Sequence, residues 1–291
     1  MCCRRLIILV VWVLFAGSIL AGGLDVARKR LVCKTLHNGL QVTVLPMPES
    51  PVVATQIWVH VGSANEDEHS RGFAHLFEHL MFGGTAHHDK RDYWELHERH
   101  GGDNNAYTAF DETVYVSEIL PEGHRSLLAM EADRLGQLTL NEDNLTNEKR
   151  IVTEELRLRT ENDPFSRVLH RAFKAVLGAH PYGPMPIGTK EDIARAELEQ
   201  CRRFYKHYYS PSNAHLVIVG PVDPAQTLDQ VEEAFGPLPA GQGSPPDVPA
   251  LMEWSFPKQT IVLDEDLPQP RSPFLPGLFL RRLLPIQLRS R

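Results

Sequence analysis

The chain has 291 residues, of which 42% are hydrophobic and 8% aromatic, enough for one large globular domain or two small ones. Its formal net charge is −7, and all charged residues of the two ends (1–23 and 272–291) are arginines, so the middle is more acidic still. An acidic folded part repels phosphate backbones, which excludes nucleic acid as an expected partner.

Residues 1–23 form an N-terminal segment of a distinct kind. Arg4 and Arg5 precede an uncharged apolar run, LIILVVWVLFAGSILAGGL, with small residues at 21–23. A basic start, an apolar centre and small residues are typical of a secretory signal peptide. The run is also long enough to cross a bilayer as an N-terminal anchor. We expect export, to the periplasm or outside the cell, with cleavage favoured over anchoring and with membrane contact only through this segment.

The cysteines do not form a disulfide framework. Cys2 and Cys3 lie in the N-terminal segment, so the body of the chain has only Cys33 and Cys201. Neither has a second cysteine close by in the sequence, as a CxxC metal site requires. Two interpretations stay open: one disulfide between them in an oxidising compartment, or two unpaired thiols.

The predicted elements begin with strands. Residues 40–45 alternate between apolar and polar, residues 52–61 are rich in β-branched side chains, and 105–120 reads as a further strand. Helices are predicted at 71–82, 89–100, 122–138, 142–160, 164–177, 190–208 and 224–235, with a short buried strand at 215–219. Strands grouped with runs of helices indicate an α+β fold, in which a layered antiparallel or mixed sheet packs against helices.

The domain boundaries follow from composition. Residues 30–238 form one domain, and the Gly/Pro/Ser-rich residues 239–250 are a linker. Residues 251–271 begin like another strand and are expected to start a truncated second domain. Residues 272–291, SPFLPGLFLRRLLPIQLRSR, show neither helical nor strand periodicity. We expect an aberrant or disordered tail, such as a frameshift produces; the alternative is a basic, apolar tail that docks on a membrane or a partner.

The motif HLFEH places His75 and His79 four residues apart, on one face of a helix. Imidazole is a good zinc ligand, and this spacing supplies half of a tetrahedral site. Glu78 lies on the adjoining face, where a carboxylate can act as general base towards a metal-activated water. The order HxxEH occurs among zinc peptidases. The alternative is a partly exposed helix whose histidines bind nothing.

A third ligand is sought on the helix predicted downstream. Its apolar stripe includes Leu145, Val152 and Leu156, and Glu148 and Glu155 fall on or beside that stripe. Carboxylates turned towards a core are costly unless a cation pairs with them. A zinc ion would offset that cost. The alternative is two solvated glutamates on a charged helix.

Five separated segments within residues 32–271 resemble the inverzincin (HxxEH) zinc peptidases, which include pitrilysin, insulin-degrading enzyme and the mitochondrial processing peptidase β-subunit. They are HLFEHLMFGGT, GGDNNAYTAFDETVY, NEKRIVTEE, HPYGPMPIGTKEDI and YYSPSNAHLVIVGPVD. The resemblance implies a pitrilysin-like metallohydrolase half, whose catalytic domain is residues 30–238. It also implies one zinc ion per chain, with Glu155 as the third ligand and Glu148 as a supporting carboxylate that orients a histidine.

The same resemblance implies a peptide-binding strand at Asn105 and Ala106. There a substrate peptide adds to a sheet edge, and Asn105 bonds it near the scissile carbonyl. Asn104 is the alternative, because the pair of asparagines permits a shift of one residue. The other histidines of this region, His87, His88, His97 and His100, lack ligand spacing and are expected on the solvated surface.

The sequence therefore predicts a zinc endopeptidase that cleaves extended peptides or unfolded proteins. Members of this family pair an active half with a related half, so we expect a homologous partner chain or a homodimer to complete the site. The alternative function is a peptide-binding or assembly subunit that is non-catalytic or inactivated by truncation. The motif residues argue against loss of the metal site, because all of them are present.

Overall fold

The computed structural model describes residues 29–161, 163–178, 180–241, 261–265 and 286–290. The predicted signal peptide or anchor (1–23), most of the linker (239–250) and most of residues 251–291 lie outside the described residues. Among the residues described, no helix combines the length and the hydrophobicity that a membrane crossing requires.

The centre of the structure is a six-stranded sheet with the strand order β1-β2-β6-β3-β5-β4. Its strands are β1 (Val32–Thr35), β2 (Gln41–Pro46), β3 (Val53–Val59), β4 (Asp103–Thr108), β5 (Thr113–Ile119) and β6 (Ala214–Gly220). Only the β2–β6 pair is parallel, and the other neighbours are antiparallel. The prediction of an α+β fold with a mixed sheet packed against helices is confirmed.

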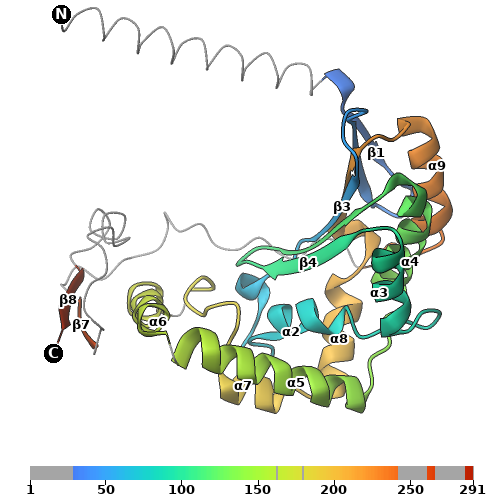
Figure 1. Cartoon of the computed structure of the whole chain (residues 1–291). Helices are drawn as coiled ribbons and strands as arrows, with labels where there is room; N and C mark the ends of the chain where they lie inside the picture. Colours follow the sequence, from blue (N-terminus) through green and yellow to red (C-terminus); the bar gives the residue numbers. More distant parts are fainter. Residues whose placement is uncertain (1–28, 162, 179, 242–260, 266–285, 291) are drawn as a thin grey trace, which may run out of the picture.

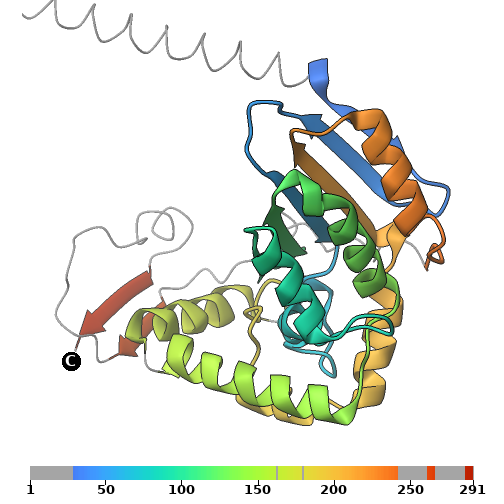
Figure 2. The same cartoon turned by 45° about the vertical axis from the view of Figure 1, so that its right-hand side comes forward.

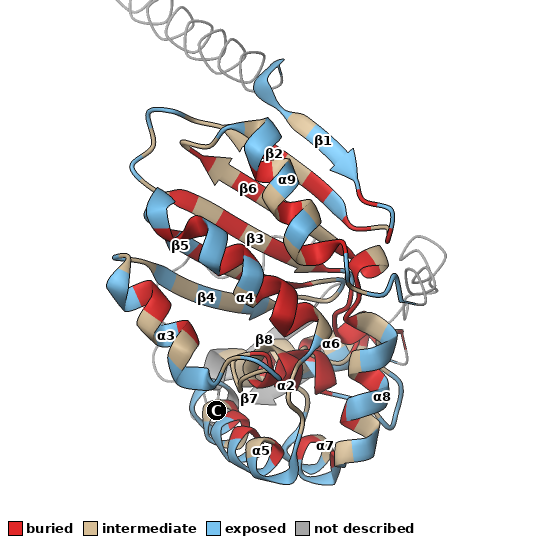
Figure 3. Ribbon diagram, turned by 90° about the vertical axis from the view of Figure 1, so that its right-hand side faces the viewer, coloured by how far each residue is buried: buried red, intermediate tan, exposed pale blue. Residues whose placement is uncertain are grey.

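The helices form layers around this sheet. The α-helices are α2 (Phe73–Leu80), α3 (Lys90–Arg99), α4 (His124–Gly136), α5 (Glu142–Leu156), α6 (Pro164–Leu177), α7 (Lys190–Arg195), α8 (Leu198–Tyr208) and α9 (Pro224–Phe235). Figures 1 and 2 show α4 and α9 against one face of the sheet, and α2 between β4 and α5. In Figure 3, buried and half-buried residues alternate along β3 and β6, as expected for strands with one face in a core.

Helix α2 is held from several sides because its apolar residues are fully enclosed. Phe73, Leu76, Phe77 and Leu80 are each at most 1% exposed, and burial of such a side chain contributes about 1.5–3 kcal/mol. The ring of Phe77 stacks on that of Phe204 in α8, with the ring centroids 5.2 Å apart. These contacts fix the helix that carries the HLFEH motif.

Two predicted elements are each divided in the structure. The predicted strand 105–120 is a hairpin of β4 and β5, closed by a hydrogen bond from the Ala109 N–H to the Glu112 carbonyl oxygen (2.8 Å). The predicted helix 190–208 is α7 and α8. Lys149 of α5 donates to the carbonyl oxygens of Ala194 and Ala196 at the break. That contact comes from a distant part of the chain, so no local pattern could reveal it.

The C-terminal region contains two short strands, β7 (Ile261–Glu265) and β8 (Ile286–Ser290), which pair in parallel. The expected strand near residue 260 is therefore present. Within the predicted tail, the structure describes a strand at residues 286–290, whose sequence IQLRS alternates between apolar and polar residues.

Two expectations about single side chains are also resolved. His97 is buried, not solvated, because its Nδ1 atom lies 2.8 Å from the Tyr93 carbonyl oxygen and its ring packs on Tyr93. Cys33 is exposed on β1 and Cys201 is buried in α8, and both are free thiols. The disulfide interpretation is therefore wrong, and that of two unpaired thiols holds.

Candidate active site

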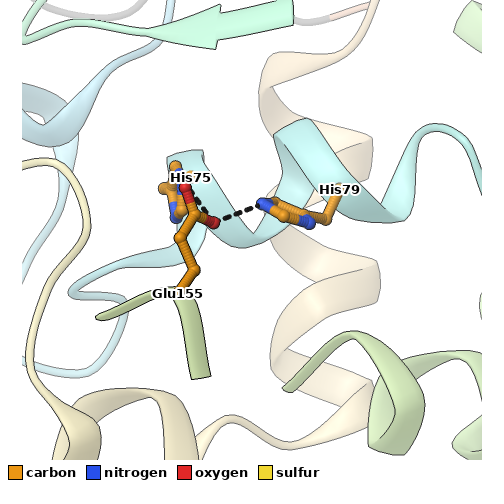
Figure 4. A group of neighbouring side chains, drawn as sticks. All are labelled: His75, His79 and Glu155. Carbon is orange, nitrogen blue, oxygen red and sulfur yellow. Dashed lines mark hydrogen bonds and ion pairs between the residues drawn. The ribbon is translucent and has the colours of Figure 1, made fainter. Parts of the chain in front are cut away.

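Two adjacent helices bring three potential metal ligands together. His75 and His79 lie one turn apart on α2, and Glu155 projects towards both from α5 (Figure 4). One ligand atom of each residue lies within 4.8 Å of the other two. Among the residues that the structure describes, this is the one such group of histidine, cysteine and carboxylate side chains.

The charges at this group favour a cation. Oε2 of Glu155 lies 3.1 Å from Nε2 of His79 and 3.6 Å from Nε2 of His75. The hydrogen bond with His79 lowers the pKa of Glu155, so its carboxylate is ionised. Burial lowers the pKa of His75 to about 4 and thus keeps its imidazole neutral. For His79 burial acts in the same direction, but the hydrogen bonds with Glu148 and Glu155 outweigh it and raise the pKa to about 9.

This donor set fits zinc. The neutral imidazole of His75, the imidazole of His79 and the ionised carboxylate of Glu155 are all of the kinds of ligand that zinc prefers. The raised pKa of His79 favours a protonated ring between the two carboxylates when no metal is bound. A dication bound at the same point would satisfy the carboxylates and release that proton.

Glu148 lies behind the three converging residues. Its Oε2 atom is 3.7 Å from Nδ1 of His79, on the far side of the ring from Glu155. Asn147 donates to its Oε1 atom (3.1 Å), and Nζ of Lys90 lies 3.8 Å from that atom. Burial opposes ionisation of Glu148, but the hydrogen bond with His79 and the charge of Lys90 lower its pKa.

Glu78 faces the sheet instead of α5. Its Oε2 atom accepts a hydrogen bond from the Thr108 hydroxyl on β4 (2.6 Å). Burial raises the pKa of Glu78, although this hydrogen bond acts in the opposite direction. The sequence reasoning missed Thr108. The alternation along β4 could have indicated it, because Thr108 shares a strand face with Ala106.

A pocket of 220 Å³ lies beside Glu78 and His79 and extends to β4. Its remaining lining residues are Phe82, Trp94, Asn104, Asn105 and Ala106. The side chain of Asn104 shares the strand face of Ala106 and Thr108. Its Nδ2 atom is buried and has no hydrogen-bond partner in the described part of the chain. The side chain of Asn105 leaves the strand on the other face.

Among the residues that the structure describes, no strand pairs with the outer edge of β4. Because the Ala109 N–H bonds to Glu112 at the turn, alternate residues bond to β5, and the N–H groups of Asn104 and Ala106 face outwards. Side chains of the same strand occupy these donors. Oδ1 of Asp103 accepts from the Asn104 N–H, and Oδ1 of Asn105 accepts from the Ala106 N–H, both at 2.9 Å. A peptide that adds to this edge must displace them.

The comparisons with known proteins agree on one protein family. Residues 42–184 match the sequence pattern of the insulinase peptidases (peptidase family M16), and residues 195–272 match that of the M16 inactive domain. The zinc protease PqqE of Helicobacter pylori is 34% identical over 205 residues, which are 70% of this chain and 46% of that protein.

Two solved structures share the fold. A protease from Helicobacter pylori superposes with a TM-score of 0.74 at 32% identity, over 81% of this chain and 57% of that chain. The first half of the periplasmic protease PqqL from Escherichia coli gives a TM-score of 0.69 at 26% identity, over 81% of this chain and 51% of that chain. The chain spans about half the length of the curated relatives named zinc proteases that it matches.

Proposed function

The chain belongs to the insulinase family of peptidases, M16, and we propose that it is the metal-binding half of a zinc endopeptidase. The observation that carries the proposal is the convergence of His75, His79 and Glu155 from two helices. Two imidazoles and one carboxylate are the protein ligands of many catalytic zinc sites, in which a further position stays open. These three residues would hold one zinc ion per chain.

When bound, zinc supplies a Lewis acid that polarises the scissile carbonyl and makes water a stronger acid. Glu78 acts as general base: its carboxylate takes a proton from the attacking water and passes it to the leaving amide nitrogen. The burial that raises the pKa of Glu78 makes it a better proton acceptor. Thr108 keeps that carboxylate in place, and Glu148 orients the ring of His79.

The substrate is an extended peptide or an unfolded protein that adds to the free edge of β4. The outward backbone groups of Asn104 and Ala106, on either side of Asn105, then bind the peptide with little demand on its sequence, and the side-chain amide of Asn105 bonds it near the cleaved bond. Support comes from the position of this edge, because Asn105, Ala106, Glu78 and His79 line one pocket.

Asp103→Ala is expected to lower KM for an extended peptide by about 2- to 10-fold and to leave kcat unchanged. The substitution removes the side chain that occupies the Asn104 N–H, and a net hydrogen bond contributes about 0.5–1.5 kcal/mol. A substrate carbonyl can then bind that N–H without displacing a competitor. Steady-state kinetics with a quenched fluorescent peptide measures both constants.

The matched control is Asp103→Asn, which removes the charge opposite Glu118 but keeps an oxygen that can accept from the Asn104 N–H. Its KM should stay near that of the wild type. If both variants lower KM equally, the charge of Asp103 matters and its hydrogen bond does not. If neither changes KM, the peptide does not use this part of the edge.

We also propose that a homologous second half, from a partner chain or a second copy, completes the enzyme, and that the protein works after export. The half-length match to curated relatives supports the first point. The description of the Escherichia coli relative as the first half of a periplasmic protease supports both.

The proposed function is tested by zinc-dependent cleavage of a quenched, unstructured peptide. Cleavage should stop when zinc is chelated, resume when zinc is restored, and be absent in Glu78→Gln. Zinc binding without cleavage that depends on Glu78 would favour the non-catalytic binding subunit instead.

A further inference from the structure

The first turn of α2 lacks a cap of its own. Its N-cap residue is Gly72, which has no side chain and adopts the left-handed conformation with φ of 80°. No acidic residue lies in the first turn. The first backbone N–H groups of a helix have no partner within the helix, so other groups must satisfy them.

Packing explains why position 72 carries no capping side chain. A Cβ atom on Gly72 would lie 2.8 Å from Cδ1 of Ile193, and one on Gly188 would lie 2.9 Å from the Gly72 Cα atom. The loop at Gly188 and helix α7 therefore press directly on the start of α2. Any cap must come from elsewhere in the chain.

Glu66 supplies that cap. Its Oε2 atom accepts from the Gly72 N–H and its Oε1 atom from the Ala74 N–H, each at 2.8 Å. Both oxygens of one carboxyl group thus accept hydrogen bonds from backbone N–H groups at the helix N-terminus. Burial raises the pKa of Glu66 to about 8, although both hydrogen bonds act in the opposite direction.

The residue next to Ala74 is His75, whose Nε2 atom faces Glu155 at 3.6 Å. Nδ1 of His75 is buried and has no hydrogen-bond partner among the described residues. By contrast, Nδ1 of His79 faces Glu148. Since the second ring nitrogen of His75 is held by no hydrogen bond, the direction of the ring depends on the position of its backbone as well as on Glu155, and Glu66 holds the backbone just before it.

We propose that Glu66 is a positioning residue for the metal site, which sets His75 through the first turn of α2. This inference rests on the proposed zinc function. The two histidines are then held in different ways. Glu148 contacts the ring of His79, whereas Glu66 binds the backbone N–H of Ala74, just before His75. Loss of the cap loosens the first turn, whereas the second turn, with Glu78 and His79, keeps its contacts to β4 and α5.

The test is the zinc affinity of the full chain, measured by competition with a chromophoric chelator. Glu66→Ala is expected to weaken zinc binding by about 10-fold, the size of effect that loss of a helix cap produces. Glu66→Gln keeps one oxygen acceptor and should recover part of the loss. Glu68→Ala truncates a glutamate two residues away whose side chain is 79% exposed, and should bind zinc like the wild type.

The melting temperature of the metal-free variants separates positioning from stability alone. If Glu66→Ala and Glu66→Gln melt earlier but bind zinc as tightly as the wild type, Glu66 is only structural and the inference is overturned. If Glu66→Ala does not fold, an unchanged zinc affinity in Glu66→Gln overturns it equally. A wild-type chain that takes up no zinc overturns the proposed function, and this inference with it.

Discussion

Glu78→Gln is expected to lower kcat for an extended peptide by about 10²- to 10⁴-fold, the contribution of a positioned general base. The amide has almost the same shape as the carboxylate and can still accept the Thr108 hydrogen bond, but it cannot take up a proton from water. His75, His79 and Glu155 are unchanged, so zinc content should equal that of the wild type. Cleavage and bound zinc are measured on the same preparation.

The control for this variant is Glu233→Gln, on the exposed surface of α9, where Glu233 pairs with Arg125. It should leave kcat unchanged. If Glu78→Gln loses zinc together with activity, Glu78 supports the metal and does not act as the base. If it keeps both, another group moves the proton.

Glu155→Gln is expected to weaken zinc binding by more than about 100-fold. Glu155 is the one carboxylate among the three converging ligand atoms, and a neutral amide is a poor ligand for zinc. The remaining histidines alone provide half of a tetrahedral site. Competition with a chelator measures the affinity, and activity should fall in proportion to the zinc lost.

Two neighbouring glutamates make the comparison specific. Glu148→Gln should weaken zinc binding by about 10- to 100-fold, as expected for a residue that orients a ligand. Glu154→Gln, next to the proposed ligand but exposed and paired with Arg157, should have no effect. If Glu148→Gln costs more affinity than Glu155→Gln, the roles of the two carboxylates are reversed.

Spacing along one helix allowed the sequence to predict which side chains of the candidate site share a helix face. The spacings of four residues from His75 to His79 and of seven from Glu148 to Glu155 are nearly whole numbers of turns, so each pair shares a face before any tertiary contact exists. The layered α+β fold could also be predicted, since β3 and β6 alternate regularly and the helices are amphipathic.

Features that depend on distant contacts could not be predicted in this way. At the break between α7 and α8, Lys149 of α5 binds two carbonyl oxygens. The cap from Glu66 crosses six and eight residues to reach α2, and Thr108 meets Glu78 from another element. Periodicity describes which face a residue occupies, but not which element covers that face.

The peptide-binding edge lies between these cases. Alternation places Asn104 and Asn105 on opposite faces of β4, but only the paired hairpin determines which N–H groups face outwards. The side chains that occupy those donors, Asp103 and Asn105, follow from the same geometry. The sequence alone therefore predicts a strand at this position, but it does not predict that the outer edge of the strand can bind a peptide.

The central claim is that α2 and α5 together hold one zinc ion. The most direct measurement is zinc content combined with zinc-edge X-ray absorption on the zinc-loaded wild-type chain. We expect one zinc per chain, bound by two imidazole nitrogens and a carboxylate oxygen at about 2.0–2.2 Å. A folded chain that takes up no zinc, or a zinc ion bound through sulfur or through fewer than two imidazoles, would contradict the account.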